Sequence, residues 1–479
     1  MDKKTTSNFI YNLLFQILNI VAPLITTPYI ARVLGADGVG IYSYTSTMAT
    51  TFALFATLGS SIYGQREIAM RQSDLQARST VFWELLILRL GTTLLVTIAY
   101  LVLCFLYRDY TVYLLLCLFI VIAPMLDTSW LFTGMENFKV TVTSNSIIRL
   151  LIIASLFLLV RKPEDLGAYI AINAASGVLG TVYLFFSLPH YVKPVPLKQL
   201  NILQHLPGVI KYFIPIIAVQ IYSQIDKLML GAMGANAAEN GYYEQARKLT
   251  NLVVVMTTAL NTVLLPRLSN LFGKDDKKAM VQTYQETFHF TLLLLLPIAV
   301  GLFMISDEFI LWFLGTDFIK TAVLLKWSCL LIIFMTVGNF IGMQYLNPTG
   351  QQGKMTVVYL IAAGVNVVLN LLMIPRLLSE GAIIASVIAE AISCGAQVWL
   401  LKRSEYRFPM LKGVWKCGVA AAAMAGAIWL FNAQVPLSGM IETLADILLG
   451  AASYFVVLLL LKEESLYGLA GKLLAKIKK

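Results

Sequence analysis

The stretch "VLGADGVGIYSY", residues 33–44, returns in altered form as "MLGAMGANAAENGYYEQA", residues 229–246. Each copy reads as a helix end with an apolar pair and Gly-Ala, a short turn, and a Gly-x-Tyr that opens the next helix. A second matched pair follows in the same order, "LGAYIAINAASGVLGTVYL" from Leu166 and "EGAIIASVIAEAISCGAQVWL" from Glu380. Two matched landmarks in one order indicate an internal duplication.

The two copies are separated by 196 residues at Gly35 and Gly231 and by 214 residues at Gly167 and Gly381. Six expected helices lie between them, and an even number gives both halves the same orientation. Parallel repeats of this kind are related by an axis along the membrane normal, and the substrate binds between them. We expect an N-terminal six-helix bundle at 1–190, a linker at 191–207, a second six-helix bundle at 208–402, and two extra helices with a basic tail at 403–479.

The composition is that of a membrane protein. Of the 479 residues, 58% are hydrophobic and only 13% are charged, whereas soluble proteins carry about 25% charged residues. Apolar runs of about 18 or more residues predict membrane helices, so we expect an all-α polytopic protein with about fourteen of them. The expected spans are 8–34, 39–62, 79–105, 112–133, 139–160, 166–188, 208–232, 241–265, 283–305, 321–346, 355–374, 380–401, 412–433 and 440–461.

Basic residues are distributed unequally between alternate loops. With the N-terminus inside, few face outward, and most face inward, including those of the linker and the C-terminal tail. This asymmetry predicts cytoplasmic N- and C-termini, and it explains the net charge of +10 through anionic lipid headgroups without nucleic acid. The outward set is Arg32, Arg108, Arg161, Lys162, Lys320 and Arg376.

Motifs for catalysis or cofactor binding were not found. The three histidines show no HExxH spacing, and the chain lacks a GxxxxGKS phosphate loop and a GxSxG nucleophile elbow. The five cysteines fall in or beside apolar spans without a CxxC pair, so we expect small buried hydrophobes rather than metal ligands. The chain is therefore not expected to be an enzyme or to carry a cofactor or metal, and transport driven by an ion gradient or the membrane potential is the favoured class.

Polar faces run along the first helix of each half. In the first helix the polar side chains recur at steps of three and four, and the helix from 208 repeats this with Asp226 at the margin of its polar face. The two faces predict a shared aqueous cavity, while interhelical hydrogen bonding is the structural alternative. The polar residues are Asn8, Asn12, Gln16 and Asn19 in the first helix and Gln220, Ser223, Gln224 and Lys227 in its counterpart.

Charged residues also lie deep in several spans, where they are rare and often mark a substrate path. Arg89, Arg149 and Glu390 fall near mid-depth, and Arg149 follows Thr141 and Asn145 at steps of four.

In the eighth span Arg247 clusters with Glu244 and Lys248, whose spacing also fits a structural ion pair. The basic excess predicts an anionic substrate, such as a phosphate or an acidic sugar. We expect Arg89, Arg149, Lys227 and Arg247 to line the cavity and Arg32 to guard its outward end. Asp226 and Glu390 are candidates for holding a coupling cation, H⁺ or Na⁺, or for balancing the basic groups.

Six phrases together resemble the polysaccharide or oligosaccharide flippases, the polysaccharide-transport branch of the superfamily that includes the multidrug and toxic-compound extruders and the lipid II flippases. They occur in the family's order and span most of the chain. Asp127 and Trp130 of the second phrase also fit a structural role, capping a helix and anchoring it at the interface. The phrases are "PYIARVLGADGVGIYSY" (28–44), "DTSWLFTGMENF" (127–138), "IDKLMLGAMG" (225–234), "GYYEQARKL" (241–249), "GNFIGMQYLNPTGQQGK" (338–354) and "NVVLNLLMIP" (366–375).

The resemblance implies a MATE-like fold, with two six-helix bundles around a central cavity and two further helices at the C-terminus. It implies a flippase that moves an undecaprenyl-pyrophosphate-linked oligosaccharide from the inner to the outer leaflet of the bacterial plasma membrane by alternating access, with a polymerase or glycosyltransferases as partners. The alternatives are a multidrug exporter, a lipid II exporter, and a membrane component of polysaccharide assembly that transports nothing.

Overall fold

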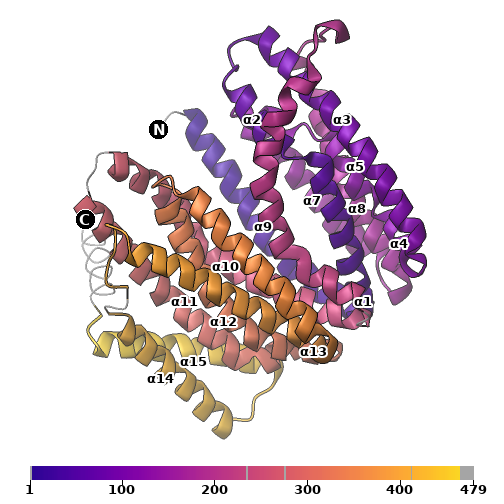
Figure 1. The fold of residues 1–479 in the computed structure, drawn as a ribbon. Coiled ribbons are helices and arrows are strands. Elements are labelled where there is room, and N and C mark those ends of the chain that lie inside the picture. The colour runs from indigo at the N-terminus through magenta and orange to yellow at the C-terminus, as the bar shows by residue number, and fades with distance from the viewer. Residues whose placement is uncertain (1–2, 234–235, 274–276, 411–412, 464–479) are drawn as a thin grey trace. The chain divides into compact units, whose positions relative to one another are not determined.

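The computed structural model describes residues 3–233, 236–273, 277–410 and 413–463, with the side chains of 3–17, 218, 221 and 256–273 left outside the description. These residues form helices and turns without a strand, which confirms the expected all-α class. The chain divides into two compact units, Met1–Gly241 and Tyr242–Lys479, and Figure 1 labels the helices of each. Helix α9, expected to open the second half, is grouped with unit 1, and the expected domain limits stay a prediction.

Unit 1 consists of nine α-helices joined by short 3₁₀ turns. In the linker, residues 197–199 and 202–205 form such turns. The helices are α1 Lys3–Thr57, α2 Ser60–Ala69, α3 Leu75–Leu106, α4 Thr111–Leu116, α5 Leu118–Leu126, α6 Ser129–Gly134, α7 Phe138–Leu159, α8 Leu166–Ser187 and α9 Leu206–Ala232.

Unit 2 contains the remaining long helices, of which α10 begins in the last residues of unit 1. A π-helical turn at Gly342–Leu346 follows α12. The helices are α10 Ala237–Gly273, α11 Lys277–Phe313, α12 Ile319–Ile341, α13 Gln352–Lys402, α14 Val414–Gln434 and α15 Gly439–Leu460.

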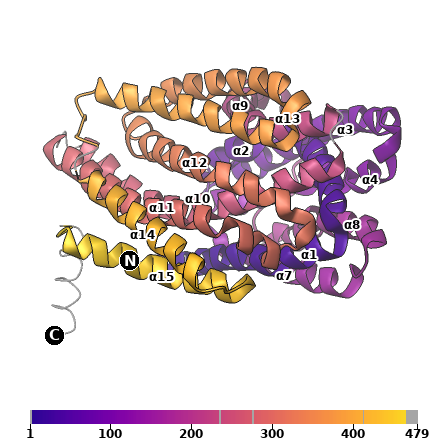
Figure 2. The same cartoon turned by 90° about the horizontal axis from the view of Figure 1, so that it is seen from below.

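Among the described residues, ten helical segments are long and apolar enough to cross a membrane, or eleven if the bent pair in α9 counts as one span. Two of them each contain a pair of the expected helices. The first, α1, is broken at Gly35, where φ is 66°, and α13 is broken at Leu378, where φ is 54°. Figure 2 shows the two arms of α13 running side by side. Gly381 permits this close return, because a Cβ there would lie 2.6 Å from the Met373 carbonyl oxygen.

Two expected spans are interrupted. The helix expected at 39–62 ends at Thr57, because Leu58 and Gly59 both take positive φ angles, and α2 begins after them. The helix expected at 112–133 is divided into α4, α5 and α6, with extended backbone at Asp127. This second interruption places polar backbone at membrane depth, which is tolerated only where protein or a polar cavity satisfies it.

The two copies of the repeated motif pack against each other in unit 1. A Cβ on Gly40 would lie 1.7 Å from the Ala237 carbonyl oxygen, and a Cβ on Gly241 would lie 2.2 Å from the carbonyl oxygen of Ala36. The start of α10 is also capped from α1, because the Ala238 N–H donates to the Asp37 carboxylate at 3.0 Å. Glycine is needed at these positions because only it lets two backbones approach so closely.

The linker is fastened to the bundle by a buried polar network. Glu84 of α3 and His205 are both nearly inaccessible, and the His205 Nε2 lies 2.8 Å from a Glu84 carboxylate oxygen. The other carboxylate oxygen accepts from the Asn201 N–H at 2.6 Å, and the Tyr63 hydroxyl lies 3.0 Å from His205 Nδ1. Buried polar groups must be paired in this way to offset their desolvation.

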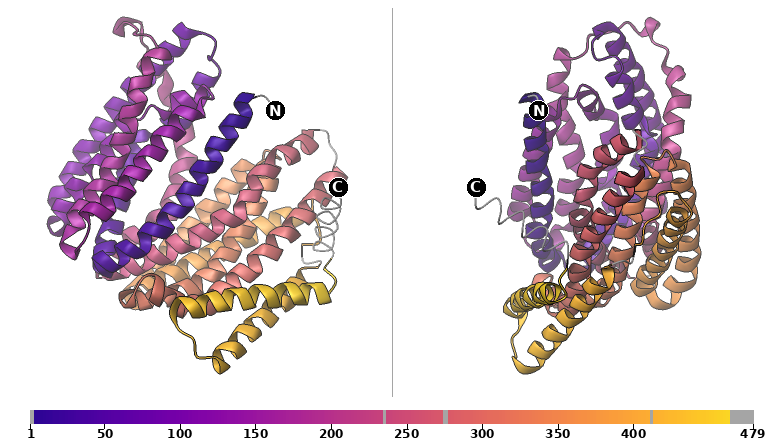
Figure 3. Two further views of the ribbon diagram at one scale, coloured as in Figure 1. Left: turned by 180° about the vertical axis from the view of Figure 1, so that it is seen from behind. Right: turned by 90° about the vertical axis from the view of Figure 1, so that its left-hand side faces the viewer.

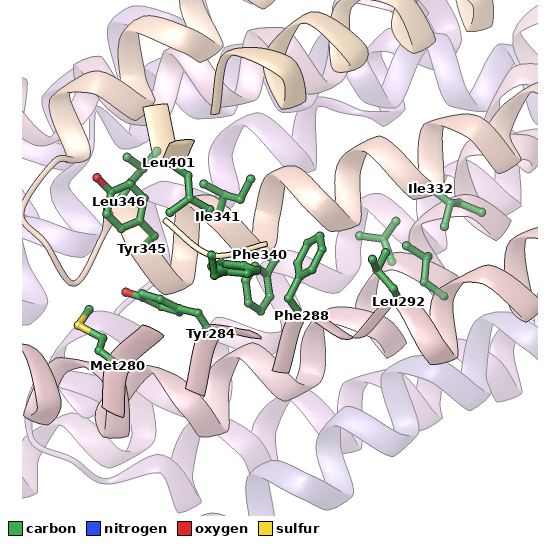
Figure 4. Close-up of a cluster of buried hydrophobic side chains, with 13 residues drawn as sticks. Met280, Tyr284, Phe288, Leu292, Ile332, Phe340, Ile341, Tyr345, Leu346 and Leu401 are labelled. Carbon is green, nitrogen blue, oxygen red and sulfur yellow. The ribbon is translucent and has the colours of Figure 1, made fainter. Parts of the chain in front are cut away.

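Unit 2 is held by an aromatic core between α11, α12 and α13, shown in Figure 4. Tyr284 and Phe288 of α11 face Phe340 and Tyr345, with the Phe288 and Phe340 ring centroids 5.2 Å apart. Helices α14 and α15 form a C-terminal hairpin, visible in Figure 3, and the Tyr454 hydroxyl donates to the Leu293 carbonyl oxygen of α11 at 2.9 Å. All five cysteines are free and buried, as expected.

We predict that Gly40→Ala destabilises the protein by about 1–3 kcal/mol, because the new methyl group meets a backbone oxygen that cannot move aside. Gly91→Ala in α3 is the matched control, because a Cβ at this helical glycine meets no atom within 4 Å. Thermal unfolding in detergent should show a lower melting temperature for Gly40→Ala and an unchanged or higher one for Gly91→Ala. Equal melting temperatures for the two variants would contradict the packing of the two motifs.

We also predict that His205→Ala lowers the stability by about 2–4 kcal/mol, because it leaves the buried Glu84 carboxylate without one of its partners. His190→Ala, which truncates an exposed histidine near the same linker, should leave the melting temperature within a degree or two. A His205→Ala variant as stable as the His190→Ala variant would show that the linker is not held by this network.

Candidate functional site

A polar cavity of about 560 Å³ lies within unit 1, and its described lining residues come from seven helices (α1, α2, α3, α5, α6, α7 and α8) and from Asp127 between α5 and α6. The charged residues of its lining are Arg89, Arg149 and Asp127, which leave one net positive charge. The other lining residues are mostly hydroxyl, amide, glycine and short apolar side chains. They are Asn19, Thr57, Ser61, Ile120, Ala123, Pro124, Ser129, Thr141, Asn145, Ile148, Ile152, Ser176, Gly177, Gly180, Thr181 and Leu184.

Arg89 is the more buried of the two cavity arginines, with 3% of its surface exposed. Its guanidinium lies 3.2 Å from a carboxylate oxygen of Asp127 and also donates to the Asp127 carbonyl oxygen. Its Nε–H has no hydrogen-bond partner in the part of the chain that the structure describes. A buried cation of this kind needs a counter-charge, and Asp127 supplies it from the break between α5 and α6.

Asp127 also organises the chain on its own side of the cavity. Its second carboxylate oxygen accepts from the Ser129 N–H at 2.9 Å, and this bond starts α6. The capping role expected for Asp127 is therefore present, together with the ion pair to Arg89. Trp130 is 2% exposed and stacks on Phe82 with ring centroids 5.5 Å apart, so the interpretation of Trp130 as an interfacial anchor was wrong.

Arg149 is placed by the regular spacing of α7. Thr141, Asn145 and Arg149 follow one another at steps of four, and all three line the cavity, because such steps keep side chains on one helix face. The Nε–H of Arg149 is buried, and none of the described residues forms a hydrogen bond with it. At about 1.5 Å per residue, Arg149 lies roughly 16 Å along α7 from Phe138, near the middle of that helix.

The opposite wall is formed by small residues of α8. Ser176, Gly177, Gly180 and Thr181 line the cavity, and the Gly180 carbonyl oxygen accepts from the Ser144 hydroxyl of α7 at 2.7 Å. Because these side chains are short, α7 and α8 lie close together while the cavity keeps its volume.

Among the remaining described candidates of unit 1, Asn19 lines this cavity and the others do not. Arg32 is exposed, Asp226 is 3% exposed and buried in α9, and Lys227 is half-buried with its carbonyl oxygen accepting from Asn240 at 3.0 Å. Gln220 and Gln224 are half-buried on α9. The side chains of Asn12 and Gln16 lie outside the described residues.

Two candidates belong to unit 2. Arg247 of α10 is half-buried and lies 4.0 Å from the sulfur of Met335. Glu390 of α13 is 7% exposed, and it faces the same helical glycine as Gln397, because a Cβ on Gly338 would lie 3.9 Å from a Glu390 oxygen and 3.2 Å from the Gln397 amide nitrogen. Within the described residues, no three His, Cys, Asp or Glu side chains gather into a metal site.

Unit 2 also contains a largely apolar cavity of about 410 Å³ between α11, α14 and α15. Pro297, Gly301, Met424 and Phe455 are among its lining residues, with Asp446 as the single charged one. The chemistry of this lining suits a hydrocarbon chain.

The sequence analysis identified Arg89, Arg149 and Asn19 but missed Asp127 and the α8 wall as cavity residues. The small residues of α8 carry a signal, because Ser176, Gly177, Gly180 and Thr181 share one helix face. No sequence pattern predicts that Asp127 pairs with Arg89, because the two are 38 positions apart and their pairing depends on tertiary packing.

Comparisons with known proteins identify the family to which this chain belongs. The model of the family described as polysaccharide biosynthesis protein matches residues 5–272, and the MatE family model matches residues 213–372. A putative O-antigen transporter of Escherichia coli (strain K12) is 21% identical over 57% of this chain and 67% of its own length. The probable low-salt glycan biosynthesis flippase Agl15 of Haloferax volcanii is 23% identical over 90% of this chain and 91% of its own length.

The fold is shared with solved transporters. The lipid II flippase MurJ in an inward closed conformation aligns with a TM-score of 0.74 at 17% identity, over 93% of this chain and 98% of that one. A multidrug resistance MATE family transporter in an inward-facing conformation aligns with a TM-score of 0.58 at 13% identity, over 79% and 97%. The resemblance seen in the six phrases is thus confirmed, and the chain belongs to the polysaccharide biosynthesis protein family, with the fold of the MATE and lipid-flippase transporters.

Proposed function

We propose that the protein is a flippase that moves undecaprenyl-pyrophosphate-linked oligosaccharide repeat units from the inner to the outer leaflet of the bacterial plasma membrane, for cell-surface polysaccharide synthesis. The observation that carries this proposal is the pair of arginines, Arg89 and Arg149, in one polar cavity at membrane depth. Family membership and the flippases among the relatives support the same class.

The charge of the cavity fits the phosphate part of such a substrate. Each arginine has a buried Nε–H without a hydrogen-bond partner among the described residues, and buried donors of this kind are normally satisfied by a ligand, water or protein. Guanidinium groups bind phosphate through paired hydrogen bonds, which are stronger than neutral ones. A diphosphate can therefore use both arginines, while Asp127 balances Arg89 when the cavity holds no anion.

The uncharged lining fits the sugars. Hydroxyl and amide groups of Ser61, Asn145, Ser176 and Thr181 offer donors and acceptors without the shape restriction that large side chains would impose. The lipid chain needs no place among them, because it can remain in the hydrocarbon of the membrane.

Alternating access between the two repeats would carry the polar headgroup across while the chain follows in the membrane. The orientation with both termini in the cytoplasm follows from the positive-inside rule. Asp226 and Glu390 remain the proposed sites for a coupling cation, H⁺ or Na⁺. Arg32, Lys227 and Arg247 remain proposed contributors of positive charge on the substrate path.

The alternatives differ in the charge that they require. A multidrug exporter for cationic compounds needs an acidic cavity, whereas this lining has a net positive charge. A lipid II exporter would share the diphosphate chemistry and differ only in the sugar. In a membrane component that transports nothing, the two buried arginine donors of the cavity would have no transported ligand to bind.

We predict that Arg89→Ala and Arg149→Ala each weaken binding of a lipid diphosphate by about tenfold to a hundredfold, because each removes charge-assisted hydrogen bonds. Binding of undecaprenyl pyrophosphate to the purified protein, and surface polysaccharide in cells carrying each variant, are the two measurements. Arg161→Ala, which removes an exposed arginine outside the cavity, is the matched control and should resemble the wild type. Unchanged binding in the double variant Arg89→Ala/Arg149→Ala, at normal protein levels, would remove the cavity from the transport path.

We predict the opposite effect for Asp127→Asn. The amide oxygen can still accept from the Ser129 N–H, but the negative charge that competes for Arg89 is lost, so undecaprenyl pyrophosphate should bind severalfold more tightly. The variant should show no gain for an uncharged lipid-linked sugar in the same assay. Equal or weaker diphosphate binding would mean that Asp127 does not compete with the substrate.

A further inference from the structure

A second charged pocket lies in unit 2, formed by different residues from those of the proposed transport cavity. It has a volume of about 620 Å³ and collects Lys277 from the start of α11, Lys354 from the first turn of α13, and Trp399 and Arg403 from the end of α13. The break at Leu378 folds α13 back on itself, so its two ends meet here although the helix is 51 residues long. The volume is within the range of small-molecule sites.

The pocket keeps two cations without a carboxylate partner. Lys277 forms an ion pair with Glu405, and the hydrogen bond from Lys277 lowers the pKa of the Glu405 carboxyl, so these two charges neutralise each other. Among the described residues, neither Lys354 nor Arg403 is paired with a carboxylate. The described lining therefore carries two net positive charges.

Both cations are held in place by neutral groups. The Lys354 ammonium donates to the Gln351 amide oxygen at 2.8 Å, and Gln351 in turn donates to the hydroxyl of Tyr345, whose side chain is buried. The Arg403 guanidinium lies over the Trp399 ring, 4.2 Å from its centroid. Stacking leaves the guanidinium edge available for an anion, because a cation–π contact uses its face.

The position of the pocket identifies the source of that anion. Its residues lie at the ends of the candidate membrane spans Lys277–Phe313 and Gln352–Lys402. The ends of membrane spans lie at the depth of the lipid headgroups. Trp399 is 52% exposed, and tryptophan is enriched at this interface. Basic pockets between membrane helices bind anionic headgroups.

We propose that this pocket binds the phosphate of an anionic membrane phospholipid, with Lys354 and Arg403 contacting the phosphate and Trp399 lying along the upper part of an acyl chain. A lipid in this position bridges the start of α11 and both ends of α13. Its binding does not depend on transport, so it can be tested separately from the flippase proposal.

The test is native mass spectrometry of the full-length protein, titrated in neutral detergent with phosphatidylglycerol and, in parallel, with phosphatidylcholine. Phosphatidylglycerol should bind more tightly, and Lys354→Gln and Arg403→Gln should each weaken it about fivefold, with roughly 25-fold weakening in the double variant. Lys402→Gln removes an exposed neighbouring charge outside the pocket and should leave the affinity unchanged.

Four results would overturn the proposal. Wild-type affinity in the double variant, or equal weakening in Lys402→Gln, would show that the bound lipid does not use this pocket. Displacement of phosphatidylglycerol by glycerol 3-phosphate at similar concentrations would identify a soluble phosphate as the ligand. Tighter pocket-dependent binding of undecaprenyl pyrophosphate than of phosphatidylglycerol would assign the pocket to the transported substrate instead. All variants concern exposed side chains, and size-exclusion profiles in detergent check that they fold.

Discussion

Direct contact between backbones at glycines is the constraint on which the arrangement of unit 1 depends. Gly40 and Gly241 belong to the two copies of the repeated motif, and each lies against a carbonyl oxygen of the other copy. In a membrane, helices gain little from burying apolar side chains against each other, so close backbone approach and hydrogen bonding provide much of the specificity. The two similar sequence motifs therefore supply both surfaces of this contact.

The deep charges could be predicted from the sequence because their positions are energetically unusual. An arginine in the middle of an apolar helix needs a polar environment, and this rule alone predicts Arg89 and Arg149 as cavity residues. The i, i+4 steps from Thr141 to Arg149 added a direction, since they define one face of α7. Both inferences rest on local rules that a single helix obeys.

The parts that could not be predicted depend on distant neighbours. Hydropathy alone predicted one helix over 112–133, but Asp127 breaks it to meet Arg89 and to cap α6. The break at Leu58 and Gly59 is equally hidden in an apolar run, because it is set by a positive φ angle. In the same way, the pocket proposed to bind phospholipid joins residues from two ends of α13, which only the fold brings together.

The pairing of Arg89 with Asp127 has a consequence for selectivity. A lone buried guanidinium would attract chloride, the most abundant small anion, and the cavity would be occupied much of the time. With the Asp127 carboxylate in place, an incoming anion binds only if its interaction with Arg89 is stronger than that of the carboxylate that it replaces. A monovalent ion gains little by that exchange, whereas the diphosphate of the proposed substrate would contact Arg149 as well as Arg89 and so gain two contacts for the one it breaks. By this argument, Asp127 would make the basic cavity selective for a diphosphate over monovalent anions.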